Sequence, residues 1–174
     1  MASIFDTIKQ QAGDKEKSLN WYKGKINALS SRISAGRLMR DGKLRKAPRF
    51  NRLHFFRYDP KTKAKLPYYD LFPLVMPIDT AKGGFLGINF HYLPIPARMK
   101  LLEALDKKKF RGDYSSLKNL KYIKPTIKHY LRSQFVSGFL DLDEDDYAPA
   151  IFMPVAQWRK GTPTQVYRDS RRRY

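Results

Sequence analysis

The 174-residue chain contains no cysteine, and acidic residues are scarce, with 16 Asp and Glu against 35 Lys and Arg. The lack of cysteine excludes disulfides, thiolate nucleophiles and thiolate zinc sites. No run of 18 apolar residues is present, which excludes a membrane-spanning helix, and the first residues have neither the charged nor the apolar region of a secretory signal. A hydrophobic content of 42%, with 14% aromatic residues, predicts a folded protein rather than a disordered basic tail.

The formal net charge of +19 is unevenly distributed along the chain. Residues 1–52 carry +9 and residues 95–135 carry +8, whereas residues 53–94 carry +2 and residues 136–174 carry none. Such a charge predicts an anionic partner. Nucleic acid is the first candidate, a polyanionic protein assembly the second and an anionic membrane surface the third. The two basic blocks flank a nearly neutral, aromatic centre, so we expect the partner to contact the flanks.

Residues that could support catalysis form no recognisable constellation. The three histidines, His54, His91 and His129, lack metal-ligand spacing. The acidic run 141–146 fails as a calcium loop, because Asp146 stands where glycine is required and Phe152 where a glutamate is required. The glycine-rich segment 83–87 lacks the Gly-Lys-Ser/Thr ending of a phosphate-binding loop. We therefore expect no enzyme activity, no metal, no cofactor and no small-molecule substrate.

Apolar residues recur at alternating steps of three and four between residues 5 and 33, which predicts a long amphipathic helix over residues 1–35. Two helices broken near Gly13 or Gly24 are the alternative, because each internal glycine weakens a helix. The apolar stripe either packs on its own domain or forms a seam with a helix of another chain. The predicted partner-helix seam comprises Phe5, Ile8, Leu19, Tyr22, Ile26, Leu29 and Ile33.

Residues 36–52 form the densest basic block, interrupted by glycine and proline, which predicts an extended arm. Such an arm follows a DNA backbone or an acidic neighbouring subunit, and composition does not separate the two. A second basic arm is expected in the tail, residues 159–174. The candidate contacts in these arms are Arg37, Arg40, Lys43, Arg45, Lys46, Arg49, Arg52, Arg171, Arg172 and Arg173.

Residues 53–158 predict a central α+β domain. Strands are expected at 53–58, 66–70, 74–78, 85–93 and 138–142, forming a small antiparallel sheet or open barrel. Helices are expected at 96–110 and 117–136. The second helix would present a basic stripe of further candidate contacts, namely Lys118, Lys121, Lys124, Lys128 and Arg132.

Aromatic and basic residues interleave at 54–58, 68–69 and 90–92. Exposed aromatic rings on a barrel would stack the bases of a single strand. The alternative, which we favour, is that most of these rings fill the core.

Several segments of the central domain resemble a small basic virion protein of contractile-tailed, T-even-type and cyanophage-like bacteriophages. They read FFRYDPKTK at 55–63, LPYYDLFPLV at 66–75 and GFLGINFHYLP at 84–94, with VYRDSRR at 166–172 closing the pattern. The resemblance implies a structural virion component, either of the DNA-end protector and head-completion class or of the baseplate and tail-hub class. It transfers no individual site residue.

We therefore predict a non-enzymatic structural component of a tailed-phage virion, made in the host cytoplasm. Its N-terminal helix and basic arms would bridge other virion proteins, and duplex DNA is a further candidate partner; no membrane partner is expected. The alternative is a free nucleic-acid-binding protein, which would lack sequence-specific readout because no helix-turn-helix, zinc finger or ribonucleoprotein motif is present.

Overall fold

Antiparallel strand pairing organises the computed structural model, which describes residues 2–107 and 114–172. A six-stranded sheet has the order β1-β7-β2-β4-β5-β6, and a separate two-stranded sheet pairs β3 with β8. The larger sheet contains β1 Leu44–Arg45, β2 His54–Phe55, β4 Leu74–Ala81, β5 Gly84–Asn89, β6 Ile127–Leu131 and β7 Phe139–Asp141, and the smaller one β3 Tyr69–Asp70 and β8 Trp158–Arg159. The α+β prediction is confirmed, and the sheet is open rather than a closed barrel.

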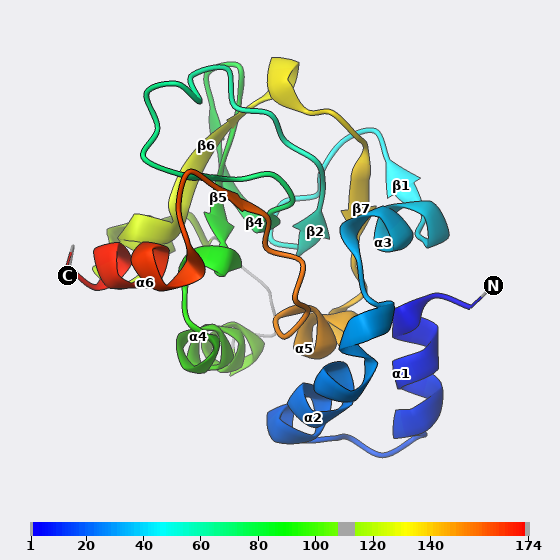
Figure 1. Cartoon of the computed structure of the whole chain (residues 1–174). Helices are drawn as coiled ribbons and strands as arrows, with labels where there is room; N and C mark the ends of the chain where they lie inside the picture. The colour runs from blue at the N-terminus through cyan, green and yellow to red at the C-terminus, as the bar shows by residue number, and fades with distance from the viewer. Residues whose placement is uncertain (1, 108–113, 173–174) are drawn as a thin grey trace.

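Helices and 3-10 turns surround this sheet (Figure 1). The helices are α1 Ile4–Ala12, α2 Leu19–Leu29, α3 Ala35–Asp41, α4 Ile95–Lys107, α5 Tyr147–Ala150 and α6 Pro163–Arg171. The 3-10 turns are η1 Ser30–Arg32, η2 Phe90–Tyr92, η3 Tyr114–Asn119, η4 Lys124–Thr126, η5 Arg132–Gln134 and η6 Glu144–Asp146. In the view of Figure 1, α1, α2, α4 and α5 lie below the sheet, and long loops lie above it. Within the described ranges, no helix has the length and apolar character needed to cross a membrane.

The two faces of the sheet bury different side chains. Phe55 packs into the large core between the sheet and the helices. Its neighbour Phe56 packs on the opposite face, in an aromatic cluster with Phe85, Tyr130 and Phe139. Successive residues of a strand point to opposite faces, so one aromatic pair supplies both cores. Most of the interleaved aromatic rings are thus core residues, as favoured from the sequence.

The hairpin β4–β5 is the best-formed part of the sheet, and its turn depends on glycine. Gly83 has φ +77°, a conformation that other residues rarely adopt. At Gly84 a side chain would overlap the backbone carbonyl of Tyr130 in β6, so glycine allows β6 to pair closely with β5.

The N-terminal segment forms two helices rather than one, as the alternative break near Gly13 predicted. Ser3 and Asp6 form a capping box at the start of α1, and Gly13 ends the helix with φ +64°. The predicted seam lies within this chain. Its members Phe5, Ile8, Ile26 and Ile33 are buried in the large core, and Leu19, Tyr22 and Leu29 pack against it. This corrects the partner-helix prediction, because the helices fold back on their own domain and leave the stripe unavailable.

The basic block 36–52 is also not a free arm. Ser34 caps α3 by accepting a hydrogen bond from the backbone N–H of Arg37, and Leu38 is buried. The following residues form β1, in which Leu44 pairs with Leu140 of β7. Apolar residues interspersed among the arginines anchor the segment to the sheet, which the charge count alone did not reveal.

The two other basic segments differ from prediction in the same way. The expected helix over 117–136 is replaced by η3, η4 and β6, because Pro125 interrupts a helix and the β-branched Ile127, which begins β6, favours an extended backbone. The C-terminal tail contains α6, which Thr162 caps and Val166 anchors in the core. The expected helix at 96–110 is found as α4, apart from residues 108–110, which lie outside the described ranges.

Candidate nucleic-acid interface

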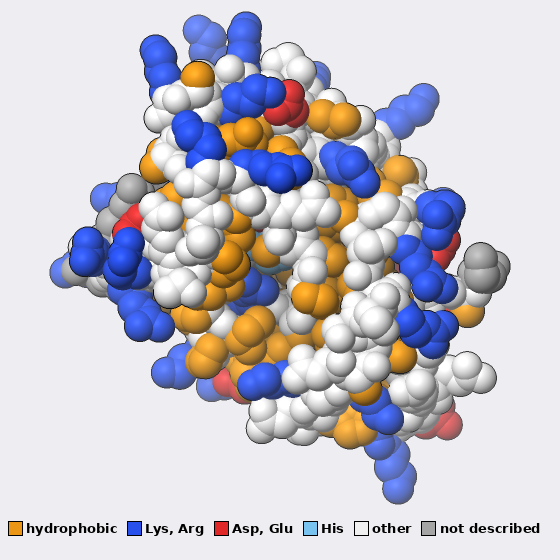
Figure 2. Space-filling model, viewed as in Figure 1, with side chains coloured by type: hydrophobic (Ala, Val, Ile, Leu, Met, Phe, Trp, Pro, Cys, Tyr) orange, Lys and Arg blue, Asp and Glu red, His pale blue; other side chains and the backbone are white. Residues whose placement is uncertain are grey.

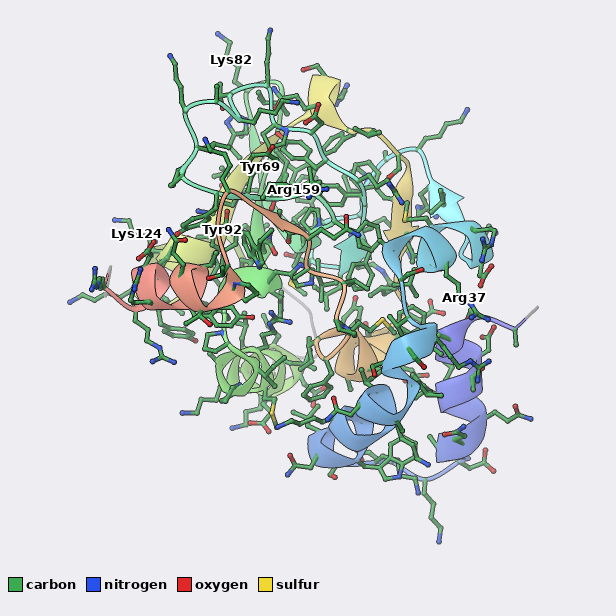
Figure 3. All side chains as sticks on the ribbon, in the orientation of Figure 1. Arg37, Tyr69, Lys82, Tyr92, Lys124 and Arg159 are labelled. Atoms are coloured by element: carbon green, nitrogen blue, oxygen red, sulfur yellow. The ribbon has the colours of Figure 1, made fainter. Side chains whose placement is uncertain are left out.

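Five basic side chains gather where the loops lie at one end of the sheet, and we call this group the basic rim. Hydrogen bonds hold its segments together. The backbone N–H of Asp59 donates to the carbonyl of Gln134 at 3.1 Å, and that of Arg132 donates to the carbonyl of Gly83 at 2.8 Å. The exposed members of the rim are Lys61, Lys63, Lys65, Lys82 and Arg132. Figure 2 shows blue side chains projecting from this end, and Figure 3 labels Lys82 there.

Lys160 fixes the backbone of the loop 61–66, which carries three lysines of the rim. Lys160 Nζ donates to the carbonyl oxygens of Lys63, Ala64 and Leu66 at 3.2, 3.2 and 2.6 Å. Lys63 pairs with Asp59 at 3.0 Å, but exposed ion pairs are weak and easily exchanged for other partners. The loop therefore presents its lysines from a held backbone, with a positive field at its surface.

A pocket of about 450 Å³ opens beside the rim, and we call it the tyrosine pocket. Its aromatic lining comes from Tyr58, Tyr68, Tyr69, Tyr92 and Tyr130. Tyr69 is half-buried, whereas the other four tyrosines are buried. In Figure 3, Tyr69 and Tyr92 lie on the same side of the molecule as Arg159 and Lys124, and Figure 2 shows a hydrophobic hollow between groups of blue side chains.

The lysine at the edge of this pocket lies over an aromatic ring. Lys128 Nζ is 4.1 Å from the centroid of Tyr92, a cation–π distance. Trp158 packs behind Tyr92 edge-to-face at 4.8 Å, and Tyr69 pairs with Arg159 across β3 and β8. The mouth thus combines aromatic surface with two cationic side chains.

A buried polar network forms the floor of the tyrosine pocket. Asp70 Oδ2 accepts from His91 Nδ1 at 2.6 Å and from Asn89 Nδ2 at 3.3 Å, while Oδ1 accepts from the backbone N–H groups of Phe72 and Gln157. Burial raises the pKa of Asp70, but the His91 ring and these hydrogen bonds outweigh it, so the pKa is lowered and the carboxyl is ionised at neutral pH. Burial lowers the pKa of His91, against the opposing effect of the Asp70 carboxylate.

This network favours a structural role over catalysis. It joins β3, β5, η2 and the segment before β8 through one carboxylate. No cluster of three or more potential metal ligands occurs in the described parts of the chain. The network therefore fixes the shape of the pocket floor.

In the 37–52 block, Arg37, which Figure 3 labels, lies on a different side of the molecule from Lys82, whereas Lys46 lines a pocket together with Arg132 of the basic rim. Asp141 pairs with Arg49 and, at 3.2 and 3.9 Å, with Arg52 and Arg45. Asp41 pairs with Arg37 and Arg40. Lys43 and Lys46 are exposed. The block is thus partly neutralised by its own domain, which weakens its field relative to a free arm.

The structure brings together only some of the contacts predicted at 118–132. Lys128 lies at the tyrosine pocket and Arg132 in the basic rim, while Lys121 and Lys124 are exposed near η4. The side chain of Lys118 is not described. Arg171 ends α6 and Arg172 follows it, both exposed, and Arg173 lies outside the described ranges.

Sequence reasoning missed most of the basic rim and the pocket. The rim lysines lie in the segment 53–94, whose small net charge concealed a local cluster. The alternating pattern Lys61-Thr62-Lys63-Ala64-Lys65 after an Asp-Pro turn was the available signal. Lys82 could not be assigned to the same place, because only the β4–β5 turn brings it there.

The family model described as Phage T4 terminal DNA protecting protein matches residues 2–168. The chain belongs to this family. Membership confirms the resemblance to T-even-type phage proteins and favours the DNA-end protector class over the baseplate and tail-hub class. The family description supports a structural phage role, and the charge of +19 is compatible with DNA as an anionic partner. Searches of curated proteins and of solved structures gave no significant match.

Proposed function

We propose that this protein binds the ends of linear duplex DNA in the phage particle and shields them from exonucleases without performing chemistry. The observation that carries the proposal is the family match over residues 2–168. The basic rim beside the tyrosine pocket supports it, since phosphate contacts supply affinity and a held loop positions them. The protein acts as a steric cap on the terminus.

The same proposal places the protein in the virion after its synthesis in the host cytoplasm, with other virion proteins as neighbours. The exposed side chains of the 37–52 block and of the end of α6 are the surfaces that we assign to these neighbours or to the DNA duplex beyond its end. These are two separate surfaces, at opposite sides of the view in Figure 1, and contacts at them would orient the cap relative to the particle. Their candidate residues are Lys43, Lys46, Arg171 and Arg172.

Exonuclease protection tests the proposed function directly. An end-labelled linear duplex is incubated with the protein and then with a 5′→3′ or a 3′→5′ exonuclease, and a nicked circle digested from its internal nick is the control. We expect the protein to slow digestion from duplex ends and to leave digestion from the nick nearly unchanged. Equal digestion of the linear duplex with and without saturating protein would contradict the proposal.

Salt dependence tests which surface contacts the phosphates. The double variant Lys61→Ala/Lys65→Ala removes two rim charges. The negative slope of log affinity against log salt should therefore become shallower by about 2. A matched control, Lys15→Ala/Lys23→Ala, removes two exposed lysines from the N-terminal helical region and should keep the wild-type slope. A reduced slope in the control with an unchanged slope in the rim variant would place the interface elsewhere.

A further inference from the structure

We propose that the tyrosine pocket receives the terminal nucleobase of a DNA strand, and that this is how the protein distinguishes an end from the interior of a duplex. The inference rests on the proposed function and assigns its recognition element. The ligand class is an unpaired nucleobase with its flanking phosphate.

The size and the lining of the pocket fit such a ligand. A volume of about 450 Å³ lies in the range of small-molecule sites and leaves room for a base and part of its sugar. Aromatic side chains bind bases of any sequence, because every base has a π-face. Tyr69 is half-buried at the pocket while the other tyrosines are buried, so its ring is the one most available for stacking.

The distribution of charge distinguishes where a base and a phosphate would lie. The ionised Asp70 gives the floor a negative charge, which disfavours a phosphate there, while its two oxygens are already occupied by four hydrogen bonds from the protein. Lys128 lies at the pocket, the lysine loop 61–65 is next to it, and Arg159 is paired with Tyr69. A base in the pocket would therefore place its phosphate among cations.

The cost of removing a base from the helix explains why this pocket would select ends. Extracting an interior base breaks a base pair and two stacking contacts, whereas an unpaired terminal base has lost its pair and has one stacking neighbour. The cost is lowest for bases that are already single-stranded. A rigid pocket that needs an extruded base is therefore filled at termini first, with no sequence preference.

Photo-cross-linking on the unmodified protein locates the terminal base. The probe is a DNA hairpin duplex with a single open end, carrying 5-iodouracil at the terminal nucleotide of a short overhang; a second probe carries it in the interior. We expect the terminal probe to cross-link to peptides containing Tyr68, Tyr69 or Tyr92. Cross-links confined to residues 37–52, or equal yields from both probes, would overturn the inference.

Variants then separate the pocket from general phosphate binding. Tyr69→Ala should weaken binding to the open-ended hairpin about 10-fold, while binding to a closed dumbbell duplex stays at the wild-type level. Tyr69→Phe should retain end binding because the ring remains. Lys82→Ala, which removes a rim charge away from the pocket, should weaken binding to both DNAs equally.

The outcomes distinguish this inference from the proposed function. If the wild-type protein binds open and closed DNA equally, end binding fails and the pocket assignment fails with it. If the wild type prefers open ends and Tyr69→Ala keeps that preference, the proposed function stands and the pocket assignment alone is wrong. Thermal melting of each variant accompanies the binding data, and the cross-link on the wild type decides the question if Tyr69→Ala does not fold.

Discussion

Acid should destabilise the protein through a single buried histidine in β2. His54 Nε2 accepts a hydrogen bond from the backbone N–H of Arg49 at 3.1 Å, and Nδ1 donates to the carbonyl of Arg52 at 2.9 Å. Burial lowers the pKa of His54 to about 4 from an ordinary 6.5; Asp141 and the hydrogen bond to the Arg52 carbonyl oppose this, and the charges of Arg52 and Arg49 add to it. The folded protein therefore holds this ring neutral, and protonation at Nε2 would remove the acceptor for Arg49.

The direction and size of the effect follow from proton linkage. Between pH 6.5 and 4 the unfolded chain binds a proton at this ring that the folded chain does not, so the free energy of unfolding falls as the pH falls. For a single site with these two pKa values, the loss between pH 7 and pH 5 is about 2 kcal/mol, and it approaches about 3 kcal/mol below pH 4. The contribution is fully present above the unfolded pKa.

Urea denaturation at pH 7 and at pH 5 measures this loss in the wild type and in His54→Gln. Glutamine does not titrate, so the difference between the two pH values should shrink by about 2 kcal/mol in the variant, whatever its stability at pH 7. An equal pH difference in the wild type and His54→Gln would refute the reasoning.

Three further substitutions test the packing that supports the interface, each by urea denaturation at neutral pH. Arg98→Met should cost about 3 kcal/mol or more, because buried Arg98 donates to the carbonyls of Leu93 and Ile151, which would lose their partner; a neutral effect would contradict this. Gly84→Ala should cost about 2–3 kcal/mol, since its side chain would overlap β6, and unchanged stability would show that the strands can separate. Ser3→Ala should cost about 1 kcal/mol by removing the capping box of α1, and a loss under a few tenths would indicate a frayed helix end.

The sequence predicted the classes of element well where the pattern was local. Turn and glycine signals located the hairpin at Lys82–Gly84, and the helix after Pro94 was found within a few residues. The predictions failed where a basic composition suggested a free arm. Leu38 and Val166 are apolar residues packed against distant segments, and they convert the arms into α3 and α6, while backbone pairing with β7 forms β1.

The candidate interface was harder to predict than the fold, because it is assembled from separate segments. Lys128 was named from the sequence, but as part of a helical stripe rather than as the edge of a pocket. Tyr68 and Tyr69 were recognised as aromatic residues near basic ones, but the sequence pattern around a tyrosine is the same whether its ring lies in the core or lines a pocket. The distinction depends on which side chains the neighbouring loop and β6 leave uncovered.

Composition and local patterns were enough to predict a cysteine-free, basic α+β protein, and similarity over residues 2–168 identified the terminal DNA protecting family. These properties are sums over the chain or patterns of neighbouring residues, so no contact between distant segments is needed to read them. The places where the charge lies on the surface depend instead on the fold. Antiparallel pairing brings the loop 59–65, Lys82 and Arg132 to one end of the sheet, and it pairs Asp141 with the arginines of the 37–52 block. Basic residues that look alike in the sequence thus differ on the surface, because some of them are neutralised by acidic residues far away in the chain.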